Sequence, residues 1–336
     1  VLITLLLIYV YTYKGGIKTI VWTDTLQTLF MLLALFVSVY LIGDTLGWSA
    51  ASEGLSSLGM TDWFVTNSPK DNDFVIKGIL GGLFITLGMT GLDQDMMQKN
   101  LSCRNARESR KNMIWFSVIL FFVNFVFLIL GGLLVLYMRE FPEVQEALLN
   151  MDADKQTDRL FPFIALKSGL GVFVGITFLL GLVAAAYSSA DSALTSLTTS
   201  ISVDFFNVNK WKDKLKAERY RKLIHVLVTL LLFIVILLAN ALKEHDVITT
   251  LFILAGYTYG PLLGLFFFGI LTNRKVSDRL TWIVCLVVPI MIYFFDTYEN
   301  VWFNGYESGH ELLGINGLIC FVGLYLISKQ DKKSLS

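Results

Sequence analysis

The residues best suited to binding a cation lie in one small-residue stretch, Gly181–Asp204, inside a long hydrophobic segment. Ala185, Ser188 and Ser189 stand at i, i+3 and i+4, so a helix places them on one face. One backbone carbonyl and two hydroxyls form a set of neutral oxygen ligands, which suits an alkali cation. Small residues also serve close helix packing, and packing alone explains Ala184–Ala186. The stretch therefore predicts a monovalent cation site, with helix packing as the alternative.

Two acidic residues strengthen the cation reading. Asp191 extends the pattern, because Ser188, Asp191 and Ser192 repeat the same helical spacing. Asp24 falls in another hydrophobic segment, at a similar expected depth. Carboxylates inside a membrane are energetically costly and are usually functional. Two neighbouring carboxylates also repel each other unless a cation or a shared proton removes one charge. We therefore predict a cation-binding or proton-binding role for the pair.

These residues must be positioned by membrane-spanning helices. The chain has 336 residues, of which 55% are hydrophobic and only 16% are charged. Its apolar runs are mostly near the ~20 residues that cross a bilayer as a helix, and they lack the alternation of barrel strands. Nine such segments cover residues 1–13, 18–42, 74–98, 112–138, 168–206, 223–242, 247–271, 280–296 and 312–328. The sequence predicts an all-α polytopic membrane protein.

Several classes of function are disfavoured by composition. The three cysteines are scattered and the three histidines are isolated, so neither a disulfide framework nor a metal cluster is indicated. No nucleophile–base set or nucleotide loop is visible, so we expect no enzyme. Nothing indicates nucleic acid or an obligate protein partner. The expected partners are the lipid bilayer and small solutes.

The basic residues predict the orientation. Of 27 Lys and Arg residues, 20 fall in alternate connections and at the C-terminal end. By the positive-inside rule, that side is cytoplasmic. We expect a multi-pass protein of the cell membrane with a cytoplasmic C-terminus. The chain also begins inside an apolar run without Met, which predicts that N-terminal helices are missing.

The third segment carries a predicted helix break. Asp93 and Asp95 follow the glycines of Gly88–Gly91. Unwound backbone at membrane depth is tolerated where it is buried or lines a wet cavity. Alternatively, this segment ends early and leaves both acids in solvent. Pro261, inside the seventh segment, should kink or unwind its helix and free carbonyls. Broken helices of this kind are typical of secondary transporters built from inverted repeats.

Four motifs, in order along the chain, resemble those of the sodium–solute symporter family, which includes the sodium/glucose, sodium/proline and sialic acid symporters. They are YTYKGGIKTIVWTDTLQ (11–27), GLDQDMMQKNLSCRNARESRKN (91–112), AAAYSSADSALTS (184–196) and GPLLGLFFFGIL (260–271). The resemblance implies sodium-coupled import of a small polar organic solute by alternating access. A sugar, a sialic-acid-like compound or a carboxylate would fit.

The resemblance also implies a fold of two inverted five-helix repeats. By motif order, residues 1–336 form a single transmembrane domain that holds about core helices four to ten and two additional helices. Core helices one to three would be absent. The Ala185 carbonyl and the hydroxyls of Ser188 and Ser189 would then form half of the main sodium site. The other half belongs to core helix one.

A possible second sodium site is implied at Asp24, Asp191 and Ser192. Asp191 departs from the hydroxyl that the family has at its position. A shared proton is the rival explanation, which would make the protein a proton-coupled carrier. A structural salt bridge is disfavoured, because no Lys or Arg falls at this depth in any segment.

Substrate contacts are implied at Asp93, Gln94 and Asp95, with Thr90 just before them. Sugar-transporting members have Asn-Gln-Tyr where this chain has Asp-Gln-Asp. The resemblance therefore decides neither whether the solute is a sugar nor whether an aromatic gate is present. Acids can bind hydroxyls through charge-assisted hydrogen bonds or face a cationic group. A transporter-like sensory module is a second reading, which the short tail after Ser328 disfavours. A channel is a third.

Overall fold

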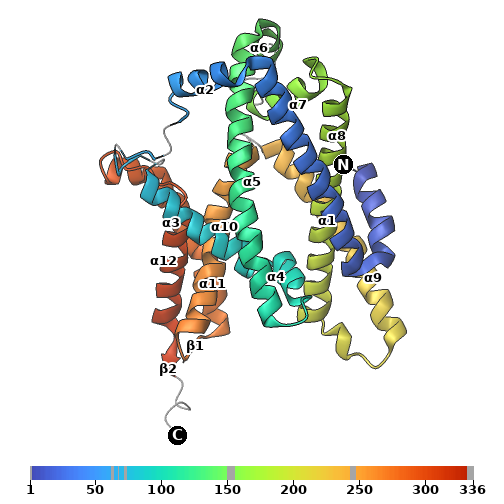
Figure 1. Cartoon of the computed structure of the whole chain (residues 1–336). Coiled ribbons are helices and arrows are strands. Elements are labelled where there is room, and N and C mark those ends of the chain that lie inside the picture. The colour runs from blue at the N-terminus through green and yellow to red at the C-terminus, as the bar shows by residue number, and fades with distance from the viewer. Residues whose placement is uncertain are drawn as a thin grey trace. The chain divides into compact units, whose positions relative to one another are not determined.

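The computed structural model describes residues 2–61, 64–66, 68–71, 74–149, 156–242 and 247–330. The helices are α1 (Leu2–Leu46), α2 (Trp48–Ser57), α3 (Val75–Thr86), α4 (Gln94–Leu101), α5 (Ala106–Glu140), α6 (Pro142–Leu149), α7 (Gln156–Lys167), α8 (Val172–Thr199), α9 (Lys214–Leu242), α10 (Val247–Leu271), α11 (Asp278–Trp302) and α12 (Leu312–Ile327) (Figure 1). The π-helices η1 (Leu87–Leu92) and η3 (Ser200–Phe205) follow α3 and α8, and the 3-10 turn η4 (Val208–Lys210) precedes α9. Strands β1 (Arg274–Lys275) and β2 (Lys329–Gln330) pair antiparallel.

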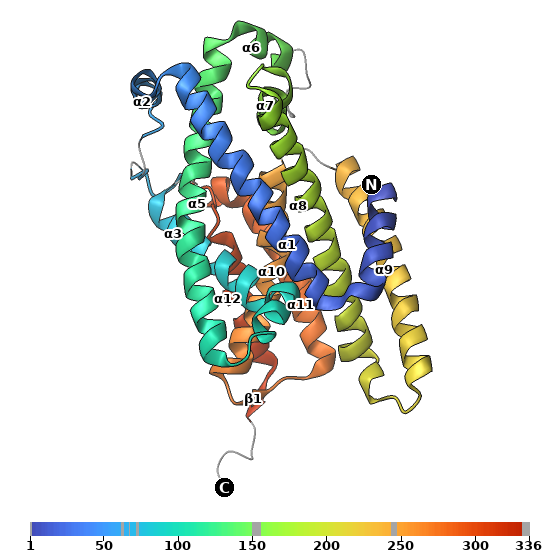
Figure 2. The same cartoon turned by 45° about the vertical axis from the view of Figure 1, so that its right-hand side comes forward.

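The predicted all-α membrane architecture is confirmed. Among the described residues, seven helices are long and apolar enough to span a membrane, and α12 is a shorter apolar helix. The two expected segments 1–13 and 18–42 both fall within α1, so the connection expected between them is helical. Figure 2 shows that the ribbon of α1 changes direction sharply in its first half. Helices α2 and α7 were not predicted, because both are short and only partly apolar.

The chain divides into two compact units. The first comprises Val1–Thr61 and Gln98–Asp246. In it α1 passes between α5 and α8 and packs along α8 (Figure 2). Gly181 of α8 makes this contact close, because a Cβ there would lie 3.4 Å from the Phe30 carbonyl of α1. A core that includes Leu35, Leu133 and Ile164 joins α1, α5 and α7.

The second unit comprises Asp62–Met97 and Val247–Ser336. Its main contact is between α10 and α12, with α11 and α3 packed against them. Phe268, Ile292 and Leu324 belong to the core where α10, α11 and α12 meet. β1 precedes α11 and β2 follows α12, so their pairing joins the start of α11 to the end of α12. There the Arg274 side chain donates from Nε to the Ser328 hydroxyl at 2.7 Å.

Pro261 frees a carbonyl, as predicted, but does not unwind its helix. α10 is continuous through Pro261. Proline has no N–H, so the Tyr257 carbonyl, four residues earlier, loses its usual donor. The fully buried Asn316 of α12 replaces that donor, because its Nδ2 donates to the Tyr257 carbonyl at 2.9 Å and to the Gly256 carbonyl at 2.8 Å. A Cβ at Gly260 would lie 1.9 Å from the Asn316 side chain, so only glycine admits this contact.

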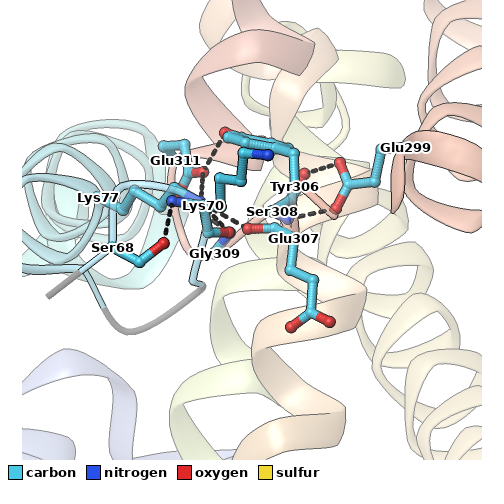
Figure 3. Close-up of polar contacts among 9 residues, drawn as sticks. All are labelled: Ser68, Lys70, Lys77, Glu299, Tyr306, Glu307, Ser308, Gly309 and Glu311. Carbon is cyan, nitrogen blue, oxygen red and sulfur yellow. Dashed lines mark hydrogen bonds and ion pairs between the residues drawn. The ribbon is translucent and has the colours of Figure 1, made fainter. Parts of the chain in front are cut away.

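A cluster of buried charged side chains joins α3 to the segment between α11 and α12 (Figure 3). Lys77 of α3 is only 6% exposed. Its ammonium donates to the Glu307 carbonyl at 2.6 Å and to the Lys70 carbonyl at 3.1 Å, and it lies 3.8 Å from Glu311 Oε1. The same ammonium lies 3.9 Å from the centre of the Tyr306 ring. Burial and the hydrogen bond to Glu311 raise the pKa of the Tyr306 hydroxyl, which therefore keeps its proton as a donor.

The role of Asn316 can be tested with a paired substitution. Asn316→Leu should lower the free energy of unfolding by about 1–3 kcal/mol, the cost of leaving a buried carbonyl without a donor. Pro261→Ala restores an N–H that can reach the Tyr257 carbonyl, so it should recover part of this loss in the double variant. Thermal unfolding in detergent measures both effects. Strictly additive losses would show that Asn316 does not act through the carbonyl that Pro261 frees.

Candidate functional site

α8 presents the predicted ligand face on an unbroken helix. The Ser188 side chain is buried, Ala185 is half-buried and Ser189 is exposed. In a continuous helix the Ala185 carbonyl accepts one intrahelical hydrogen bond and keeps a second lone pair. The three oxygens therefore lie on one helix face, part of which is open in the described chain. This geometry suits a weakly bound monovalent cation.

The Ser188 hydroxyl connects this face to α1. It donates a hydrogen bond to Asp24 Oδ1 of α1. A hydroxyl that donates its only proton in one direction presents its lone pairs elsewhere. Asp24 thus fixes the orientation of Ser188, in the way that carboxylates outside the ligand shell orient metal ligands. The close packing of α1 on α8 at Gly181 brings these two residues together.

The expectation that no Lys or Arg lies at the level of these acids is wrong. Lys99 of α4 places its Nζ 2.9 Å from Asp24 Oδ2. The same ammonium donates to the Ser192 hydroxyl of α8 at 3.2 Å. Lys99 falls just outside the expected segment 74–98, and the error arises because its long side chain reaches back from the last turn of a short helix. Asp191, adjacent to Ser192, is fully buried.

The predicted break in the third segment is confirmed. α3 passes into η1 at Leu87, and η1 ends at Leu92. The next residue, Asp93, has an extended backbone with φ −68° and ψ 128°. α4 then begins at Gln94. Gly88 is buried against Tyr259 of α10, whose ring would lie 3.0 Å from a Cβ at that position. The apolar span itself ends at Leu92, and the helical structure that resumes after Asp93 belongs to α4, so both acids lie beyond that span.

Asp93 has a structural role that the sequence did not reveal. Its Oδ1 accepts hydrogen bonds from the backbone N–H groups of Asp95 at 2.9 Å and Met96 at 3.1 Å. This is the N-cap arrangement, which satisfies two of the free N–H groups at the start of α4. Thr90 lies half-buried in η1, and Gln94 is exposed. The four predicted substrate residues therefore surround one helix break.

The second unit also contains a cavity of about 480 Å³. It is lined by Phe252, Tyr257, Asp296, Ser308, His310 and Leu313, among others. The Tyr257 hydroxyl donates to Asp296 Oδ2 at 2.5 Å. None of the four predicted substrate residues is among the described residues that line it. The sequence does carry a signal for this cavity, because Asp296 is an acid at the end of the expected segment 280–296.

Comparison with known proteins identifies relatives. The model of the sodium:solute symporter family matches residues 1–278. A sodium/sialic acid symporter of Proteus mirabilis is 23% identical over 91% of this chain and 61% of its own length. A sodium/glucose cotransporter of Vibrio parahaemolyticus is 25% identical over 59% of this chain and 38% of its own length. The chain thus spans less than two thirds of the length of these relatives.

A solved structure shares the fold. It is described as the substrate-bound outward-open state of a Na⁺-coupled sialic acid symporter that reveals a novel Na⁺ site. The TM-score is 0.74 at 19% identity, and the match covers 98% of this chain and 67% of that one. The transporter fold expected from the sequence is therefore confirmed.

The capping role of Asp93 is testable apart from any ligand. Asp93→Ala should lower the free energy of unfolding by about 1 kcal/mol, because α4 loses its N-cap. Asp93→Asn keeps an oxygen in the same place and should change stability much less. Thermal unfolding of the two purified variants provides the comparison. Equal losses in both would indicate that the charge, and not the cap, is the structural contribution.

Proposed function

We propose that this chain, which belongs to the sodium:solute symporter family, acts in a sodium-coupled carrier for a small polar organic solute. The family and the relatives are transporters and not enzymes, and the chain is a multi-pass membrane protein. One observation supports the proposal most strongly. A buried serine on the oxygen-rich face of α8 has its proton directed to a carboxylate, which leaves its lone pairs for a cation.

Sodium would bind at the Ala185 carbonyl and at the hydroxyls of Ser188 and Ser189. These ligands carry no net charge, so they would bind sodium weakly enough to release it at the cytoplasmic concentration. Asp24 lies beside the site without entering it and orients Ser188 through a hydrogen bond. Ser189 is exposed, so further ligands would complete the coordination from that side.

The solute would bind beside the helix break at η1. Thr90, Gln94 and Asp95 surround the break, and Asp93 uses Oδ1 to cap α4. Its second oxygen, Oδ2, is then available to a solute hydroxyl or a cationic group through a charge-assisted hydrogen bond. We propose a solute of the sugar, sialic-acid-like or carboxylate class, because the relatives include a sodium/glucose cotransporter, a sodium/sialic acid symporter and a bovine sodium-coupled monocarboxylate transporter.

Coupling follows if sodium and solute favour the same state of the carrier. Each ligand then raises the affinity of the protein for the other by the same factor. The distribution of basic residues supports insertion in the cell membrane with the C-terminus in the cytoplasm. No covalent step is required of any residue in this mechanism.

The sodium ligands are tested in the complete protein. Ser188→Ala and Ser189→Ala should each raise the sodium concentration for half-maximal uptake by about tenfold, the factor that corresponds to 1.4 kcal/mol of lost binding. Solute affinity should fall as well when sodium is subsaturating. Uptake of a labelled solute at graded sodium concentrations measures both quantities.

Ser196→Ala is the matched control. Ser196 lies on α8, is buried, and donates only to the Ala193 carbonyl of its own helix at 3.2 Å. Its substitution should leave the sodium dependence unchanged. If Ser188→Ala and Ser189→Ala behave like this control, the main sodium site is assigned wrongly.

The solute site is tested with Asp93→Asn, which keeps the cap and removes the charge. It should lower solute affinity about tenfold or more, since a hydrogen bond to a charged group contributes about 1.5–3 kcal/mol. Sodium affinity measured without solute should change little. Equal changes in both affinities would assign Asp93 a structural role only.

A further inference from the structure

An ammonium group lies where the sequence predicts a second bound cation. Lys99 Nζ is 2.9 Å from Asp24 Oδ2 and 3.2 Å from Ser192 Oγ. Asp24 and Ser192 are two of the three residues assigned to that site, and they come from different helices, α1 and α8. The Lys99 side chain therefore contacts both α1 and α8, the two helices that a bound sodium ion would have joined.

The chemistry of an ammonium matches what these oxygens need. It carries one positive charge and three donors. It can therefore neutralise a carboxylate and bond to a hydroxyl at the same time, as a monovalent metal ion does. A sodium ion at the same oxygens would meet a like charge within a few ångströms, which opposes binding. The two cations are therefore alternatives at this position.

We propose that the Lys99 ammonium is the resident cation of the cluster formed by Asp24, Asp191 and Ser192, so that this cluster binds no sodium ion. The inference rests on the proposed function, because a tethered cation matters only to a cation-coupled carrier. It assigns Lys99 as the residue that sets how many sodium ions the protein binds.

Local structure explains how Lys99 reaches this position. Asp93 caps the first turn of α4 and so fixes where the helix begins. Lys99 then falls in the last turn, where a cation is favoured by the helix dipole. The side chains of Lys99 and Asp24 are each 28% exposed in the described chain. In this proposal the charge of Lys99 keeps sodium out of the cluster.

The pair of Asp24 and Lys99 is linked to the main ligand face. The Ser188 hydroxyl contacts Asp24 and belongs to the main ligand set. Because the Lys99 ammonium already neutralises Asp24, the pair needs no second sodium ion.

The test is the number of sodium ions bound by the purified, complete protein at saturating sodium. Equilibrium dialysis with radioactive sodium gives this number directly. Lys99→Met removes the charge at similar side-chain length, so this variant should bind one more sodium ion than the unmodified protein. Lys99→Arg keeps the charge and should bind no additional ion. Lys212→Met, at an exposed lysine, is the control and should also show no gain.

Two further variants make the outcome decisive. Asp24→Asn added to Lys99→Met should abolish the additional ion, because the site then lacks its carboxylate. Ser192→Ala alone should leave the saturated number unchanged, because Ser192 belongs to the cluster and not to the main site, and this variant decides the matter if Lys99→Met does not fold. No gain in folded Lys99→Met, or one ion fewer in Ser192→Ala, would overturn the inference. A protein that binds no sodium until Lys99 is replaced would support it while refuting the proposed main site.

Discussion

The Asp24 carboxylate lies between two partners, and much of the first unit is arranged around it. One oxygen accepts from Ser188 of α8, and the other lies 2.9 Å from the ammonium of Lys99. An acid in a hydrophobic helix is costly unless its charge is neutralised and its lone pairs are occupied. The packing of α1 on α8 through Gly181 supplies the first partner, and α4 supplies the second. The same contacts that stabilise the carboxylate orient Ser188, the proposed cation ligand.

A related constraint shapes the second unit, where it acts on the backbone. Lipid offers no hydrogen bonds, so each N–H and C=O within a span must find a partner in the protein. Pro261 leaves the Tyr257 carbonyl without its helical donor, and Asn316 supplies a replacement. Asp93 does the same for the N–H groups at the start of α4. The carbonyl freed by Pro261 and the start of α4 are thus each matched by a polar side chain that offsets the cost.

These two constraints also account for how a carrier of this kind can work. A cation site made of neutral oxygens binds weakly, so small changes in helix packing alter its affinity. A helix break offers a solute polar groups at a depth where intact helices offer none. Because α4 begins at the break and carries Lys99 in its last turn, one short helix holds residues of the predicted solute site and of the cation cluster.

The sequence by itself determined the helical membrane architecture, the break before Asp93 and the carbonyl freed by Pro261. Each depends on local properties: the length of an apolar run, the flexibility of glycine, and the missing N–H of proline. It also placed Ala185, Ser188 and Ser189 on one face, because helical spacing alone requires it. Only the tertiary structure showed that Asn316 bonds to a carbonyl 59 residues away and that Asp93 caps α4. It also placed Lys99 beside Asp24, since the reach of a flexible lysine depends on which helices pack around it.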